Sequence, residues 1–232
     1  MQLSRILSIR TAARRLPADR SGVALIEFAF ALPLLLTIGL AGTETANYAI
    51  VTLRINQLAM LAADNAARVR ASMDETDVNE VMVGMRFAGS GIAFSQRARV
   101  IVSDIESNGA SGYRITWQRC FGAKNVASAF GVEGTGGSGT SSANALRYGI
   151  TPTGPATAAV PGTVPTTNGA LIVAEVRYTY VPLVASMFMA NRELRATQTF
   201  PVRERAQQSL TNTTNMSDAS KRLCDTAHLS AA

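Results

Sequence analysis

Residues 23–41 read VALIEFAFALPLLLTIGLA, and Glu27 is the only charged residue in this stretch. A helix rises about 1.5 Å per residue, so these nineteen residues would span roughly 28 Å, close to the thickness of the hydrocarbon core of a bilayer. We therefore expect a membrane-spanning helix over residues 23–42. This segment decides the organisation of everything that follows it in the chain.

Basic residues are concentrated just before this apolar segment. Residues 1–22 contain five arginines and one aspartate, a net charge of +4 out of +6 for the whole chain, and the next basic residue after the segment is Arg54. The positive-inside rule then predicts a cytoplasmic basic leader over residues 1–22 and an exported C-terminal bulk. A nucleic-acid binder carries its positive charge as a patch on the folded domain, so we expect no nucleic-acid partner.

Glu27 needs an explanation, because a carboxylate in a membrane helix costs about 2.5–3.5 kcal/mol near the bilayer centre. A charge at such a position is a functional hypothesis when a partner can be named. Cutting the peptide bond after Gly22 would create that partner, a free amino group on Val23. The amine would lie one helical turn from the Glu27 carboxylate.

The residues around this bond resemble a known processing site. Gly22, the four residues VALI, Glu27 and Phe28 resemble the cleavage site of type IV prepilins. The longer run from residue 21 to residue 48, with Pro33 in mid-span and Glu44 just beyond it, is similar to the TadE-like family of minor pseudopilins. These proteins belong to tight-adherence (Tad or Flp) type IV pilus systems.

The resemblance implies a location, a modification and a set of partners. Prepilin peptidase would cut between Gly22 and Val23, and Glu27, Phe28 and Pro33 would act in pilus assembly. The mature chain would be a single-pass protein of the bacterial inner membrane with its C-terminal domain in the periplasm or at the cell surface. Its partners would be prepilin peptidase, other Tad/Flp pilins and minor pseudopilins, and inner-membrane lipid.

An ordinary secretory signal or plain anchor is the alternative interpretation of the same N-terminus. Gly39 and Ala41 supply a small-x-small pattern at which signal peptidase could cut. The protein would then be an exported or membrane-anchored binding domain. The site of cleavage separates the two hypotheses, because one enzyme would cut after Gly22 and the other near Ala41.

The helix is predicted to continue beyond the membrane, over residues 43–71. Apolar residues recur there at spacings of three and four, and neither proline nor glycine interrupts residues 43–71. A second, short helix is expected over residues 74–87, with Ser72 and Glu75 as its capping box and Gly89 at its end. The residues that recur at these spacings in the first of these helices are Tyr48, Val51, Ile55, Leu58, Ala62, Asn65 and Val69, all apolar except Asn65.

Four segments then alternate apolar and polar residues with a period of two, which predicts β-strands. They lie near residues 98–103, 113–118, 172–180 and 194–200, and Pro201 would end the last one. Trp117 falls on the apolar side of its strand, so we assign it to the core. The predicted fold class is α+β: a long N-terminal membrane-spanning helix packed on a small antiparallel sheet, with a globular domain over residues 72–202, as in the general pilin plan.

Two further regions carry little pattern. Residues 131–169 are rich in Gly, Ser, Thr, Ala and Pro and predict long flexible loops, either a solvated insertion or a contact surface for another minor pilin or an adhesive target. Residues 203–232 form a polar tail that we expect to be largely mobile.

Few residues are available for catalysis or for a metal site. The chain has two cysteines and one histidine, and it lacks CxxC, HExxH, GxSxG and phosphate-loop motifs. We predict no catalytic residue, no metal site and no cofactor, and we assign no role to His228. Exported Cys120 and Cys224 can pair in only one intramolecular way, although a Cys224 in a mobile tail could also stay free or pair between molecules.

Overall fold

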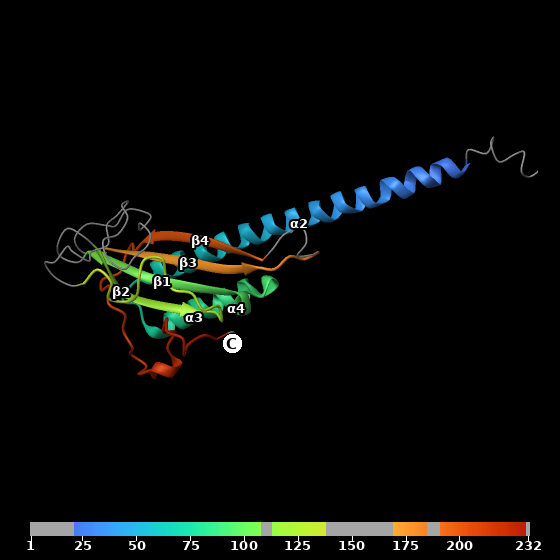
Figure 1. The fold of residues 1–232 in the computed structure, drawn as a ribbon. Coiled ribbons are helices and arrows are strands. Elements are labelled where there is room, and N and C mark those ends of the chain that lie inside the picture. The colour runs from blue at the N-terminus through green and yellow to red at the C-terminus, as the bar shows by residue number, and fades with distance from the viewer. Residues whose placement is uncertain (1–20, 108–112, 138–168, 185–190, 231–232) are drawn as a thin grey trace, which may run out of the picture.

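The computed structural model describes residues 21–107, 113–137, 169–184 and 191–230, and its longest element is the helix α2, Ser21–Arg68. The first half of α2 projects from the rest of the molecule, and the second half lies across a sheet (Figure 1). Over residues 22–40 every residue of α2 is exposed. The predicted leader, residues 1–22, lies outside the described residues except for its last two.

The sheet has four strands in the order β2-β1-β3-β4, and each neighbouring pair is antiparallel. Its strands are β1 (Ala98–Ser107), β2 (Tyr113–Phe121), β3 (Ala170–Tyr180) and β4 (Arg192–Pro201). All four predicted strands are present. A long helix packed on an antiparallel sheet confirms the predicted α+β class.

A short helix, α3 (Glu75–Ala88), follows α2 and was predicted almost residue for residue. The predicted capping residue is wrong, however. Asp74 caps α3 by accepting a hydrogen bond from the Thr76 N–H (3.1 Å), and Asp77 accepts one from the Asp74 N–H (2.9 Å). The aspartates Asp74 and Asp77 thus form the capping box that was expected from Ser72 and Glu75. An aspartate side chain accepts a hydrogen bond from a backbone N–H as well as a serine or glutamate does.

The connection from α3 to β1 is compact. It consists of η2 (Ser90–Ile92) and α4 (Phe94–Arg97), and Phe94 is fully buried. Gly89 ends α3 at a crowded point, where a Cβ atom would lie 2.4 Å from the Cβ of Phe94. Glycine is therefore required there by packing, as its predicted position at the end of the helix suggested.

The main core lies between the second half of α2 and one face of the sheet. Helix α2 presents four fully buried alanines there, Ala59, Ala62, Ala63 and Ala66. Their small side chains let the helix approach β3 and β4 closely. The large side chains filling the rest of this core are Trp117, Tyr178, Tyr180 and Phe94, so the assignment of Trp117 to the core is confirmed.

The opposite face of the sheet is also covered, which the strand periodicity did not indicate. A smaller cluster there contains Ile105, Ile115, Leu171 and Val173, and Phe130 covers it from the segment that follows β2. The start of the predicted flexible loop belongs to this cover. Thr135 accepts a hydrogen bond from the Ile115 N–H (2.8 Å), so residues 131–137 pair with β2 instead of forming a free loop. Residues 138–168 lie outside the described residues.

The prediction of a mobile tail is wrong over residues 203–230. Arg205 is buried and donates hydrogen bonds to the carbonyl oxygens of Ala66 (2.6 Å) and Val69 (3.5 Å) at the end of α2. A guanidinium is a favourable partner for the exposed carbonyls of a helix C-terminus. The tail lacks apolar periodicity because it is held mainly by such polar contacts, which leave no repeating pattern in the sequence.

Candidate functional site

The predicted processing bond lies in the first turn of α2, in open surroundings. A Cβ atom built on Gly22 would meet no other atom within 4 Å, and Val23 is half exposed. The backbone at Gly22 does not adopt a positive φ. The fold therefore places no steric or conformational demand for glycine at this position.

The three predicted assembly residues all lie on the projecting half of α2. Glu27, Phe28 and Pro33 are exposed, and Glu27 has no hydrogen bond or ion pair with any residue that the structure describes. Helix α2 continues through Pro33, although the ring removes one backbone donor. That donor would have bonded the carbonyl oxygen of Ala29, and the Thr37 hydroxyl donates separately to the Pro33 carbonyl oxygen (2.7 Å).

Apolar side chains surround this half of α2 on every side instead of forming one stripe. A helix that is apolar all round requires apolar surroundings in every direction. By length and composition, α2 is a candidate membrane-spanning helix near the N-terminus. Its exposed large apolar residues are Val23, Leu25, Ile26, Phe28, Phe30, Leu32, Leu34, Leu35, Leu36, Ile38 and Leu40.

A second carboxylate marks the point where α2 enters the domain. Glu44 is only 1% exposed. It accepts hydrogen bonds from the Tyr180 hydroxyl and from the backbone N–H groups of Leu183 and Val184, the latter two at 2.9 Å. Three donors satisfy most of the hydrogen-bonding capacity of a carboxylate, which allows it to be buried.

The aromatic residues around Glu44 complete this junction. The Tyr180 hydroxyl also accepts a hydrogen bond from the Asn47 side chain (2.8 Å), and the Tyr48 and Tyr180 rings meet edge to face at 5.2 Å. Burial, together with the neighbouring Glu44 carboxylate, raises the pKa of Tyr180. Sequence reasoning noted Glu44 only as part of a family pattern. A lone acid just past an apolar run, with an aromatic one turn later, is the available signal for such a junction.

The tail is fixed to the sheet by a covalent bond. Cys120 on β2 and Cys224 form a disulfide, with their Cα atoms 4.9 Å apart. Beside it, the Cys120 N–H donates to the Arg222 carbonyl oxygen (2.7 Å). Within the tail, His228 contacts the Asp225 carboxylate and the Asp218 carbonyl oxygen, and these contacts raise the pKa of His228. His228 thus has local partners that the sequence did not reveal.

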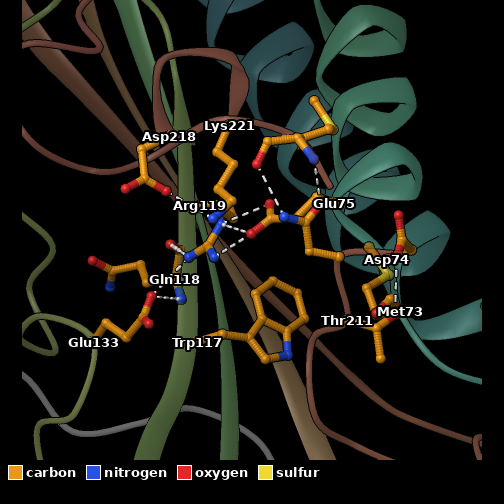
Figure 2. A network of polar contacts seen from close by, with 12 residues as sticks. Met73, Asp74, Glu75, Trp117, Gln118, Arg119, Glu133, Thr211, Asp218 and Lys221 are labelled. Carbon is orange, nitrogen blue, oxygen red and sulfur yellow. Dashed lines mark hydrogen bonds and ion pairs between the residues drawn. The ribbon is translucent and has the colours of Figure 1, made fainter. Parts of the chain in front are cut away.

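A buried polar network joins β2 to α3 next to the disulfide, and Figure 2 shows its members converging on Arg119. The Arg119 guanidinium lies between the Glu75 carboxylate (Nε to Oε2, 2.9 Å) and the Glu133 carboxylate (Nη1 to Oε2, 2.7 Å). Burial by itself lowers the pKa of Arg119, but the two carboxylates outweigh it and raise that pKa. The network holds α3, β2 and the 131–137 segment together.

Next to Glu75, the Asp74 carboxylate has several hydrogen-bond donors. Asp74 accepts hydrogen bonds from the Thr211 hydroxyl (2.9 Å) and from the Thr213 N–H (2.8 Å), in addition to capping α3. The Thr213 N–H is the main cause that holds the pKa of Asp74 below its usual range. These contacts attach the tail to the start of α3, and they are structural in character.

Over the described residues, no group of three or more His, Cys, Asp and Glu side chains is placed to hold a metal ion. No family model, curated protein or solved structure matches the chain. Among the described residues, the candidate functional features are the exposed first half of α2, with Gly22 and Glu27 at its start, and the junction at Glu44.

Proposed function

We propose that this protein is a minor pilin-like subunit of a Tad (Flp) type IV pilus, without catalytic activity of its own. Helix α2 would anchor it in the bacterial inner membrane with its α+β domain on the periplasmic side. Prepilin peptidase would cut after Gly22. One observation carries the proposal: a single helix is apolar and exposed on all sides over residues 22–40 and becomes the core helix of the domain over its second half.

Continuity of this helix favours a retained anchor over a removable signal. A cut after Ala41 would leave Glu44 as the third residue of the mature chain. The first turn of a helix lacks internal hydrogen bonds for its N–H groups and frays. Glu44 is buried and holds Leu183 and Val184, so such a cut would loosen a contact on which the domain depends.

The glycine at position 22 supports cleavage by a peptidase that recognises this residue. The fold makes no use of a glycine there, since a Cβ atom would meet nothing within 4 Å. A small residue at this position is explained if a peptidase must accommodate it. Cleavage would also leave a new ammonium group on Val23, four residues before the unpaired Glu27 and within reach of it along the helix surface.

A role in packing among membrane helices follows from that charge pair. Losing one member of a poorly solvated pair is worse than losing both, by about 3–5 kcal/mol where the pair is buried. Each subunit that enters a packed bundle would need a partner for the Glu27 carboxylate, either its own amine or that of a neighbour. Glu27 would in this way favour assembly with other pilins.

The mature N-terminus, read by mass spectrometry on protein from membranes, tests the proposal. We expect the chain to begin at Val23. Gly22→Leu should keep the leader attached. Gly39→Leu is the matched control and should still be processed, because Gly39 is a glycine of α2 in equally open surroundings.

Two outcomes would contradict the proposal. A mature chain that begins near Gly42 would identify an ordinary signal peptide and leave an exported binding domain as the function. A chain that still carries residues 5–20 would show that the leader is not processed. Either result removes the pilin interpretation.

A further inference from the structure

We infer that the chain makes a second contact with the membrane, through the segment that follows β3, residues 181–184. This segment would rest in the outer boundary of the leaflet from which α2 emerges. The inference builds on the membrane anchoring that we propose for α2. It adds a lipid-contacting surface that belongs to the exported domain.

The position of the segment along α2 is set by Glu44. The Glu44 carboxylate accepts hydrogen bonds from the N–H groups of Leu183 and Val184, both at 2.9 Å. Glu44 lies three residues beyond Ala41, the last residue of the apolar run, which is about 4.5 Å along a helix. The 181–184 segment is thereby held at the level where the hydrocarbon core gives way to the headgroups.

The surface of the segment is apolar and unusually open. Leu183 is 68% exposed and Val181 is 38% exposed, and the exposed Leu40 side chain lies on α2 one turn before Glu44. In the sequence, no charged residue occurs between Tyr180 and Arg192. An apolar, uncharged surface beside a membrane anchor is the composition expected of a segment that enters the interface.

The polar groups of this junction face one another and not the lipid. Glu44 is almost fully shielded, and its three donors come from Tyr180 and the 181–184 segment itself. Tyr48 and Tyr180 stack edge to face next to it. Tyr180 is only 1% exposed, so its ring and hydroxyl belong to the interior of the domain and shield Glu44 there.

Lipid is the occupant we assign, because the surface continues that of α2. The coil after β3 extends past the end of the sheet alongside α2, toward the exposed half of the helix (Figure 1). Because the Glu44 carboxylate accepts hydrogen bonds from the N–H groups of Leu183 and Val184, the segment lies beside α2 just beyond the end of its apolar run. A bilayer that surrounds α2 must meet this segment without any rearrangement of the domain.

Depth-dependent fluorescence quenching on the full chain in lipid nanodiscs tests this inference. Cysteines introduced one at a time carry an environment-sensitive label, while the native cysteines stay in their disulfide. Leu183→Cys and Val181→Cys report on the segment. Leu36→Cys reports on α2, and Val132→Cys is a control because Val132 is an exposed apolar residue (64%) of the 131–137 segment, which pairs with β2.

We expect lipids with a nitroxide near the headgroup to quench the labels at Leu183 and Val181, with a blue shift in emission. Lipids with a nitroxide deep in the acyl chain should quench Leu36 most, and Val132 should lose no fluorescence. If the label at Leu36 is quenched but the labels at Leu183 and Val181 lose no more fluorescence than the label at Val132, the inference is overturned. The membrane anchoring proposed for α2 would still stand. Absence of quenching at Leu36 as well would overturn the anchor itself and the inference with it.

Discussion

The first half of α2, residues 22–40, and its second half, residues 44–68, form one continuous helix but differ in what surrounds them. Apolar side chains cover the first half on all sides, and all are exposed. The second half buries one face, where its alanines pack against β3 and β4, while Ile50, Leu53 and Met60 stay exposed outside that face. The comparison teaches that one continuous helix can have two different surroundings, because one of its faces is buried against the sheet only beyond Glu44.

Each half also carries a glutamate with a different environment. Glu27 has no partner among the residues that the structure describes, whereas Glu44 has three donors and is nearly fully buried. The domain therefore already satisfies Glu44. Under the proposed function, Glu27 is left for a partner supplied by processing or by a neighbouring subunit.

The largest expected effect concerns the domain against which the second half of α2 packs, and it comes from the disulfide of that domain. The bond between Cys120 and Cys224 closes a loop with a sequence separation of 104. In the chain-entropy model, Cys224→Ser should lower the free energy of unfolding by about 4 kcal/mol, because the unfolded chain regains that freedom. Denaturant unfolding of the full chain in micelles, with and without reductant, measures the change. Two alkylatable cysteines in the protein isolated from cells would show that the bond does not form there.

The two glutamates provide the next test, with the same substitution in each half. Glu44→Val leaves the Tyr180 hydroxyl and two backbone N–H groups without their acceptor, and should destabilise the domain by about 3 kcal/mol. Glu27→Val should leave domain stability and cleavage unchanged, yet lower recovery of the chain with other pilus subunits. Thermal unfolding and co-purification measure these two outcomes. Normal co-purification of Glu27→Val would end the assembly role we propose for Glu27.

A pair of alanines compares the surroundings of the two halves directly. Ala63→Leu inserts a larger side chain into the fully buried face of α2 and should destabilise the domain by about 2 kcal/mol. Ala31→Leu makes the same change on the exposed half and should leave the domain's unfolding midpoint where it was. Equal destabilisation by both variants would mean that the first half packs against the domain after all.

The smallest expected effect concerns pH. Hydrogen bonds from the Thr213 N–H and from Thr76 and Thr211 hold the pKa of Asp74 below 3.8, so this carboxylate stabilises the fold above that pH. Asp74→Asn should cost about 1 kcal/mol at pH 7, and the difference from the native chain should shrink as the pH falls below about 4. Unfolding curves between pH 7 and pH 3 measure this trend. Glu80→Gln, on the exposed side of α3, is the control for removing a charge, and a difference for Asp74→Asn that stayed constant with pH would contradict the assignment.

The sequence by itself determined the elements and the fold class. Helix α2, helix α3 and the four strands follow from patterns within a few residues, since a helix repeats its buried face every three or four residues and a strand every two. The apolar run and the unusual position of Glu27 were equally visible, because both depend on composition over a single turn or span. The residues of the proposed processing site came instead from the resemblance of this run to the cleavage site of type IV prepilins.

Only the tertiary structure decided what the isolated polar residues do. Glu44 meets Tyr180 across a sequence separation of 136, and Arg205 meets Ala66 across 139. The ordered tail, the cap at Asp74 and the cover over the second face of the sheet depend on similar distant contacts. A hydrogen bond between two single residues far apart in the chain leaves no periodic trace in the sequence, so its partner becomes known only when the fold brings the two together.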